Sequence, residues 1–373
     1  MWVPVAMHHT RAVTSDAPHA DAAPAPARTT PAAVATPVPT PVPTPVPTPV
    51  PTPADIDSAA QAIAPHTRRT PVIEIPGETL GLDATLIFKL EYLQVTGAFK
   101  ARGAVNYVAT QAIAPTGIVA ASGGNHGAAV AYAAQRFHHD AHIFVPTTAN
   151  PAKVERLVDL HAHVHSVGTT YPEALEASRA YLAEHDATSI AAFDDPVVMA
   201  GAGTVAREFD LQTREDGGLD AMLVAVGGGG LAGGSAVWCA DRIPVVGCET
   251  VGTASYAAAL EAGEPVPVPI SGVAADHLGA TIGAVPWAAM RAGNVQSVVV
   301  TDEDVLAAQL RLWRLLRVVV EPGVAAPMAA LLTGRWKPEP GARIGVVLCG
   351  ANVVVPWGTT ALPPEMHPFT GAP

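Results

Sequence analysis

The sequence predicts an α/β protein built on mostly parallel sheets. From Asp55 onward, short runs of β-branched residues alternate with alanine-rich stretches of helical length. This alternation is typical of strand–helix–strand units, in which buried parallel strands read as continuous apolar runs. The runs expected to be strands are LIFKLE, GIVAAS, HIFVP, SIAAF, MLVAV, PVVGCE, SVVV and IGVVLCG. Because ligands of such sheets bind beyond the carboxyl ends of the strands, we expect functional residues at the junctions that follow them.

Bulk composition limits the partners of the chain. Its 373 residues are 49% hydrophobic, which is enough for a sizeable core. A net charge of −12 without a lysine or arginine run disfavours nucleic acid and anionic membrane, so a small-molecule ligand is expected. Cys239, Cys248 and Cys349 have no metal-type spacing and predict neither a disulfide framework nor a zinc site. With no signal-type start and no membrane-length apolar stretch, we expect a cytoplasmic protein.

Both ends of the chain are expected to lie outside the fold. Residues 1–54 are rich in alanine, proline and threonine, and P-V-P-T repeats between Thr36 and Pro53. Such a repeat lacks backbone donors and favours extended polyproline conformation, so we expect a disordered tail. A docking motif for a proline-binding module is the alternative. Residues 364–373 are expected to form a flexible C-terminus.

Lysine is scarce, which makes each one informative. Only Lys89, Lys100, Lys153 and Lys337 occur among the 21 basic residues. Lys100 lies in TGAFKARGA, which is expected to open a helix and place its ammonium near the positive end of the helix dipole. This position favours a lowered lysine pKa, and a neutral amine is the form that makes a Schiff base with an aldehyde. An ordinary lysine in a first helical turn is the alternative.

A glycine-rich turn follows one of the expected strands. DAMLVAVGGGGLAGGSAVWCA is typical of a strand, a tight turn and a helix, whose free N–H groups form a phosphate site. Gly228, Gly230 and Gly233 also satisfy the dinucleotide pattern G-x-G-x-x-G, with Glu249 where a ribose-binding acid is expected. That alternative leaves Lys100, the SGGNHG loop and Cys349 unexplained.

Taken together, five segments resemble the fold type II pyridoxal phosphate (PLP) enzymes of the serine/threonine dehydratase (ammonia-lyase) and serine racemase group. KLEYLQVTGAFKARGA resembles the lysine signature, with Glu91 ahead of it, and ASGGNHGAAVAYAA resembles the asparagine loop. FDDPVVMAGAGTVARE, VGGGGLAGG and LCGAN resemble the mid-chain, phosphate and pyridine-nitrogen segments. Their order is the family's, and the match runs from about residue 65 to 355.

The resemblance implies a role for each matching residue. Lys100 would hold PLP as a Schiff base and then move the α-proton of the substrate, while Phe99 packs near the ring. Asn125 would bind the ring oxygen, and Cys349 would face the pyridine nitrogen with Glu321 near the ring. The substrate carboxylate would be bound by Ser122, Gly123, Asn125 and His126. The cofactor phosphate would be bound by the backbone of Gly227, Gly228, Gly229, Gly230 and Leu231.

Several of these residues also have a purely structural interpretation. Asn125 and Ser122 suit the start of a helix, where they would act as caps. Cys349 at a strand end would be a small buried hydrophobe, and His126 would be structural or next to the substrate. His161, His163 and His165 are expected on one face of a strand, as a solvent-facing edge or alternatively as a metal site.

The implied reaction is α,β-elimination of a β-hydroxy amino acid, L-threonine or L-serine, to a 2-oxo acid and ammonia. A neutral cysteine at the pyridine nitrogen favours prompt loss of a β-leaving group. Gly123 stands where eukaryotic serine racemases place a serine as second base, so a lyase is expected. A serine racemase, another PLP elimination or replacement enzyme, and a non-catalytic PLP carrier are alternatives. Thr253 and Ser255 follow Glu249 where the family's cation site has an aspartate, so no metal is expected.

The resemblance also implies a tryptophan synthase β-like architecture of two open sheets flanked by helices. Residues 55–115 and 193–363 would form the large PLP domain, and 116–192 a smaller mobile domain, with the cofactor between them. A homodimer is expected from family relatives, and no appended regulatory domain is expected.

Overall fold

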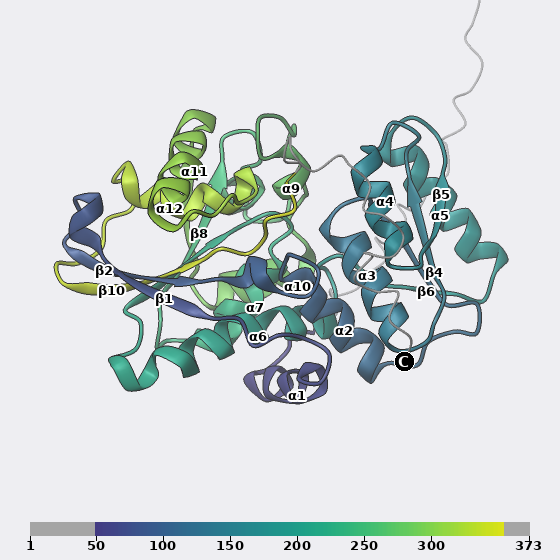
Figure 1. The fold of residues 1–373 in the computed structure, drawn as a ribbon, viewed down its shortest axis with the longest axis horizontal. Coiled ribbons are helices and arrows are strands. Elements are labelled where there is room, and N and C mark those ends of the chain that lie inside the picture. The colour runs from purple at the N-terminus through teal and green to yellow at the C-terminus, as the bar shows by residue number, and fades with distance from the viewer. Residues whose placement is uncertain (1–48, 354–373) are drawn as a thin grey trace, which may run out of the picture. The chain divides into compact units, whose positions relative to one another are not determined.

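The computed structural model describes residues 49–353, which belong to one compact unit. They form a six-stranded and a four-stranded sheet, each with helices on both faces (Figure 1). The strands are β1 Val72–Pro76, β2 Ala84–Lys89, β3 Ile118–Ala121, β4 Ala141–Val145, β5 His163–Ser166, β6 Thr188–Ser189, β7 Ala221–Ala225, β8 Val245–Thr250, β9 Gln296–Val300 and β10 Ala342–Val347. The helices are α1 Pro53–Ile63, α2 Lys100–Thr110, α3 Asn125–Arg136, α4 Pro151–Asp159, α5 Tyr171–Glu184, α6 Pro196–Thr213, α7 Gly230–Cys239, α8 Ser255–Ala262, α9 Ala275–Leu278, α10 Ala284–Ala292, α11 Asp302–Leu316 and α12 Ala326–Leu332. No helix in this range is both long and apolar enough to cross a bilayer.

The six-stranded sheet has the order β1-β2-β10-β7-β8-β9. All its neighbours pair in parallel except β1, which runs antiparallel to β2 with Val72 opposite Lys89. Helix α12 packs on β7 to β10, and α7 packs on β7 and β8 (Figure 1). The central strand β7 is buried along its whole length, as expected for a parallel strand covered on both faces.

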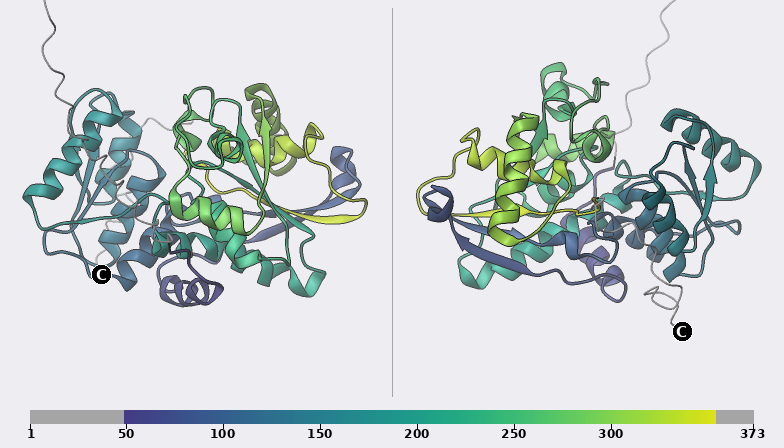
Figure 2. Two further views of the ribbon diagram at one scale, coloured as in Figure 1. Left: turned by 180° about the vertical axis from the view of Figure 1, so that it is seen from behind. Right: turned by 45° about the horizontal axis from the view of Figure 1, so that its top comes forward.

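The four-stranded sheet has the order β5-β4-β3-β6 and is parallel throughout. Helices α3 and α4 cover one side of it and α5 the other, and Figure 2 shows both sheets with their helices from two further directions. Helix α2 packs against α3 and also against α6, so it contacts the helices of both sheets. Each sheet has its own apolar core.

The strand predictions hold for most of the chain. Every run expected to be a strand overlaps one, although SIAAF contributes only to the two-residue strand β6. The sequence pattern does not predict the antiparallel strand β1, because VIEIP contains Glu74 and Pro76 and is only partly buried at the sheet edge. The placement of His161 on a strand face is wrong: it adopts φ 57° in the turn before the edge strand β5.

The predicted end of the N-terminal tail is also a few residues too late. Helix α1 begins at Pro53, and the Thr52 side chain accepts a hydrogen bond from the N–H of Asp55 while Asp55 caps the Thr52 N–H in return. Pro51 is buried, and Val50 packs on a small cluster that includes Met199. The folded part therefore includes residues that the P-V-P-T pattern assigned to the tail. The rest of that tail and the predicted C-terminal segment lie outside the described residues.

A cluster of histidines and aromatic rings covers the edge of the four-stranded sheet. His142 of β4 lies with its Nδ1 3.2 Å from Nε2 of His165 on β5, and its ring stacks on His163 at 4.9 Å. Tyr181 of α5 places its hydroxyl 3.3 Å from Nε2 of His142, and Asp140 lies beside His163. Burial, together with the neighbouring histidines, lowers the pKa of His142 and His165 below the ordinary 6.5.

The lowered pKa values predict that acid weakens this part of the fold. Because the folded state holds His142 and His165 neutral, their contribution to stability is complete above about pH 6.5 and is lost as the pH falls below it. His142→Gln should therefore reduce the drop in free energy of unfolding between about pH 7.5 and 5.5, measured with urea. The exposed His138, changed to Asn, is the control. An unchanged pH dependence in His142→Gln would rule out this role.

Candidate active site

Lys100 is the first residue of helix α2, as the sequence predicts. The chain turns into the helix through Gly97, which adopts φ 66°. The Lys100 Nζ donates a hydrogen bond to the carbonyl of Ala192 at 2.6 Å and lies over the rings of Phe99 and Phe193 at 5.2 and 5.5 Å. Burial lowers the pKa of Lys100 to about 8. The pKa is therefore lowered as expected, and burial is the main cause.

Lys89 is also buried, and its surroundings are different. Its Nζ donates to the carbonyl of Thr70 at 2.7 Å, to Glu208 at 2.5 Å and to Gln212 at 2.7 Å. An ammonium has three donors, so Lys89 has none left for a ligand. Lys100, with one hydrogen bond in the described structure, is the better candidate for reaction with an aldehyde.

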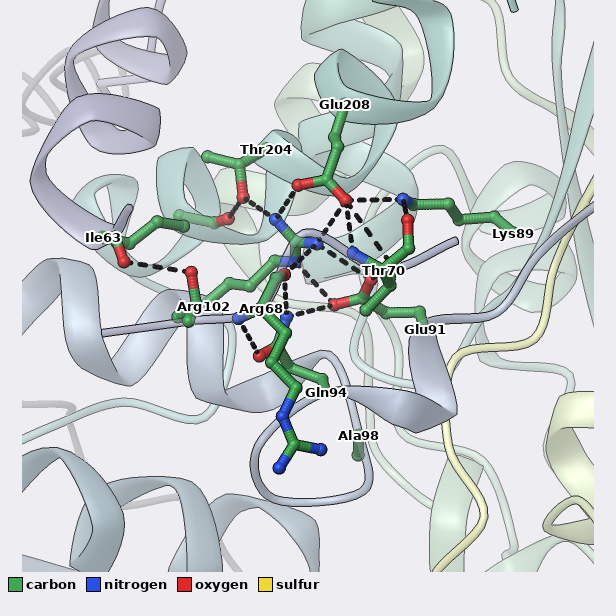
Figure 3. Close-up of polar contacts among 12 residues, drawn as sticks. Ile63, Arg68, Thr70, Lys89, Glu91, Gln94, Ala98, Arg102, Thr204 and Glu208 are labelled. Atoms are coloured by element: carbon green, nitrogen blue, oxygen red, sulfur yellow. Dashed lines mark hydrogen bonds and ion pairs between the residues drawn. The ribbon is translucent and has the colours of Figure 1, made fainter. Parts of the chain in front are cut away.

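A buried ion cluster holds the start of α2 in place (Figure 3). Arg102 donates to Glu91 from Nε at 2.5 Å and from Nη2 at 2.9 Å. The same guanidinium contacts Glu208 of α6 at 3.1 and 3.2 Å, and Glu208 also pairs with Lys89. Arg102, Glu91 and Lys89 are at most 2% exposed. Two positive and two negative charges therefore balance each other, and Arg102 lies in the same helix as Lys100.

Asn125 begins helix α3, but it does not cap it. The cap position is Gly124, which has no capping side chain, and Ser122 accepts a hydrogen bond from the Gly124 N–H at 3.3 Å. The Asn125 amide instead donates to the carboxylate of Glu321 at 2.9 and 3.0 Å. Its oxygen accepts from Asn352 at 2.5 Å, and the Asn352 N–H donates to Glu321 at 2.9 Å. The asparagine loop is thus tied to the segment that follows β10.

Cys349 and His126 lie close to Lys100. The Cys349 carbonyl accepts from the N–H of Phe99 at 3.0 Å, and burial raises the pKa of the Cys349 thiol, with the Glu321 charge adding to the effect. His126 places Nε2 3.0 Å from the carbonyl of Ile190. Burial and the nearby Lys100 charge lower the pKa of His126 to about 3. At neutral pH the thiol is protonated and the imidazole is uncharged.

The glycine run forms a turn that has no room for side chains. Helix α7 begins at Gly230 after Gly229, which adopts φ 89°, and no side chain caps its free N–H groups. A Cβ at Gly228 would overlap the ring of Phe193, and one at Gly229 would lie 2.8 Å from Pro286. A helix N-terminus approached only by backbone fits a phosphate. Leu231 is buried, so only its backbone can contribute there.

The structure rules out the dinucleotide alternative at Glu249. This carboxylate is fully buried and accepts hydrogen bonds from the N–H groups of Tyr256 and Ala257 at 2.7 and 2.9 Å. It therefore caps the start of α8 and is not available to a ribose. Across residues 49–353 there is no group of three or more His, Cys, Asp or Glu side chains arranged to hold a metal ion.

Three residues of the site have no role in the sequence-based assignment. Phe193 contacts both Lys100 and the glycine turn, Asn352 binds Asn125, and Arg156 of α4 lines a cavity beside the asparagine loop. This cavity measures about 400 Å³ and is also lined by Gly123, Gly124 and Asn125. Asn352 closely follows a strand end, which is the signal that could have identified it.

Comparison with known proteins agrees with this geometry. A model of the family described as "Pyridoxal-phosphate dependent enzyme" matches residues 63–350. The chain belongs to this family. This PLP-dependent enzyme is 33% identical over 313 residues to a serine racemase of Arabidopsis thaliana, covering 80% of this chain and 93% of that protein. It is 34% identical over 307 residues to an L-threonine ammonia-lyase of Geobacter sulfurreducens, covering 80% and 75%.

Solved structures give the same result for the fold of this PLP-dependent enzyme. Maize serine racemase superposes with a TM-score of 0.77 at 30% identity, over 82% of this chain and 95% of the other. A threonine deaminase of T.th. superposes with a TM-score of 0.76 at 33% identity, over 82% and 99%. The predicted fold type II class and the PLP cofactor are thereby confirmed.

The residues of this enzyme also fit the cofactor. Lys100 provides an amine whose pKa is lowered to about 8, and the glycine turn provides a helix N-terminus that only backbone atoms approach. Phe193 lies against both, which places the two features within one site.

Reduction with borohydride should attach PLP to Lys100. Its amine is partly neutral near pH 8 and makes one hydrogen bond in the described structure, whereas Lys89 is fully bonded. Mass mapping should find the label in the peptide that contains Lys100, and Lys100→Arg should remain unlabelled. The exposed Lys337, changed to Arg, is the control and should retain the label. A label on Lys89 would contradict the assignment.

Arg102→Leu should destabilise the fold strongly, because it leaves Glu91 and Glu208 without their buried partner. Breaking a buried ion pair costs about 3–5 kcal/mol of unfolding free energy. The control is Arg207→Leu, since Arg207 and its partner Asp57 are 28% and 46% exposed. An exposed pair contributes about 0–1 kcal/mol. Urea unfolding measures both variants, and equal losses would show that the Arg102 cluster has no special role.

Proposed function

We propose that this enzyme removes water from a β-hydroxy amino acid, L-threonine or L-serine, to give a 2-oxo acid and ammonia. The substrate loses its α-proton and its β-hydroxyl as water, and a second water hydrolyses the resulting enamine. The proposal rests on one combination in the site: Lys100 has a lowered pKa, and position 123 of the asparagine loop is glycine. One side chain can then move the proton, and position 123 offers no second acceptor. The similarity to the L-threonine ammonia-lyase supports this reaction.

Bound PLP supplies an electron-withdrawing ring that stabilises negative charge at the substrate Cα. The residues of this chain would bind and orient the cofactor and the substrate, and would move the proton. Lys100 would hold the cofactor and then accept the α-proton at Nζ, where its lowered pKa suits a base near neutral pH. Phe99, whose ring lies against the Lys100 amine, would pack beside the cofactor ring.

The cofactor and substrate would be oriented by three further groups of atoms. Backbone N–H groups of Gly227 to Leu231 would bind the phosphate at the start of α7. The loop of Ser122, Gly123, Asn125 and His126 would bind the substrate carboxylate at the start of α3, with Asn125 also reaching the ring oxygen. Cys349, as a neutral thiol, would face the ring nitrogen, and Glu321 would hold the Asn125 amide.

Serine racemisation is the second candidate function, because serine racemases are among the relatives at 33% identity. A racemase needs a proton carrier on each face of the substrate. Position 123 has space for one: a Cβ there would meet only Val145 Cγ1, at an ordinary 3.4 Å. Glycine leaves that space without an acceptor, which favours elimination.

The domain boundaries, the location in the cell and the oligomeric state are also proposals. Residues 116–192 would form the small domain, which is supported by the four-stranded sheet between Ile118 and Ser189. Residues 193–353 and 55–115, extended at the start by helix α1 from Pro53, would form the large domain, with the cofactor between the two domains. Residues 354–363 of the predicted large domain lie outside the described residues. We place the enzyme in the cytoplasm, as its three unpaired cysteines support, and expect a homodimer on the basis of the family resemblance.

Gly123→Ser tests the choice between elimination and racemisation. The added side chain meets no close neighbour at its Cβ, so racemisation of L-serine should rise relative to elimination by about tenfold or more. Pyruvate release and chiral analysis of the remaining serine measure the two reactions. Gly123→Ala is the matched control, since it adds the Cβ without a proton acceptor. A wild-type enzyme that racemises serine faster than it eliminates would contradict the lyase proposal.

A further inference from the structure

Arg156 lines the cavity beside the asparagine loop and has no carboxylate partner among the described residues. It stands in the second half of α4 and lines the cavity of about 400 Å³ together with Gly123, Gly124 and Asn125. The carbonyl of Thr96 accepts a hydrogen bond from its Nη2. No Asp or Glu among residues 49–353 lies within ion-pair distance of it. Within the described residues, the bond to Thr96 is the one hydrogen bond that the five N–H donors of Arg156 make.

Other charges around the cavity are arranged differently. Lys153, one turn earlier on α4, pairs with Asp276 at 3.3 Å, so these two balance each other. Glu155 is exposed. Burial lowers the pKa of Arg156, and the more distant negative charge of Glu321 offsets part of this lowering. Glu321 is 2% exposed and already accepts hydrogen bonds from Asn125 and Asn352. Arg156 thus forms no direct ion pair inside the described part of the protein.

A second polar group lies at the same cavity without a partner. His277 of α9 lines it, and the Nδ1 atom of His277 is buried with no hydrogen bond in the described structure. A buried polar atom without a partner costs free energy unless a ligand or water satisfies it. The unpaired charge of Arg156 therefore indicates that this cavity receives a negatively charged group, and His277 adds a polar side chain to the same cavity wall.

We propose that Arg156, assisted by His277, binds a second carboxylate on the substrate, so that the enzyme acts on acidic β-hydroxy amino acids such as 3-hydroxyaspartate. This inference rests on the proposed elimination reaction and names its substrate class. The α-carboxylate would be bound by the loop at 122–126, and the side-chain carboxylate by the planar fork of Arg156. Two parallel N–H···O bonds from a guanidinium give both geometric selectivity and strength.

The test compares a dicarboxylate and a monocarboxylate as inhibitors of the holoenzyme. L-Malate carries the second carboxylate, and L-lactate lacks it. In the wild type, L-malate should bind about tenfold to hundredfold more tightly than L-lactate, measured by calorimetry. Arg156→Gln keeps a donor for Thr96 but loses the charge, and it should bring the ratio close to one. Lys153→Gln removes the other cation of this cavity wall and should leave the ratio unchanged.

Turnover gives the second measurement. Ammonia release should show a higher kcat/KM for a 3-hydroxyaspartate diastereomer than for L-serine, and Arg156→Gln should reverse that order mainly through KM. Equal binding of L-malate and L-lactate by the wild type, or equal losses for both substrates in Arg156→Gln, would overturn the inference. If L-serine alone is eliminated, the proposed function stands and this inference fails. If nothing is eliminated but L-malate binding depends on Arg156, the anion site stands and the proposed function fails.

Discussion

The buried pairing of Arg102 with Glu91 and Glu208 is the constraint on which the active site depends. It joins the segment after β2, the first turn of α2 and the second half of α6, and α6 is distant in sequence from the other two (Figure 3). A guanidinium removed from water needs full compensation, and two carboxylates provide it with bidentate contacts. These contacts hold Arg102 in place and with it the first turn of α2. Lys100 belongs to the same turn, so its side chain extends into the site from a fixed position. Burial at that position then lowers the pKa of Lys100.

The rest of the site forms where the ends of parallel strands meet. Ser122 follows β3, the glycine turn follows β7, and Cys349 follows β10. Strands β7 and β10 are neighbours in the six-stranded sheet, so their carboxyl ends lie at one edge and bring the glycine turn near Cys349, whereas β3 brings Ser122 from the four-stranded sheet. Asn125 extends this arrangement, because its amide binds Glu321 while its oxygen binds Asn352. These two contacts hold the loop that would receive the substrate.

Sequence patterns predicted the parts of this enzyme that depend on local chemistry. Apolar runs marked the buried strands, and glycine at 227–230 marked a turn that must exclude side chains. Local patterns could not show that Glu249 caps α8, since a strand-end acid suits a ribose equally well. They also could not show that Arg156 lacks a carboxylate partner, because that depends on which helices pack together. His161 was misplaced because the turn after α4 takes it out of the strand register.

The fold presents Lys100 as an amine that is largely neutral at mildly alkaline pH. Competitive acetylation of the PLP-free enzyme across a range of pH, read by mass spectrometry, measures this directly, with exposed Lys337 as an internal reference. The rate for Lys100 should rise with a midpoint near pH 8, because burial disfavours its ammonium form. A midpoint near the ordinary lysine value of 10.5 would show that burial does not lower the pKa of Lys100.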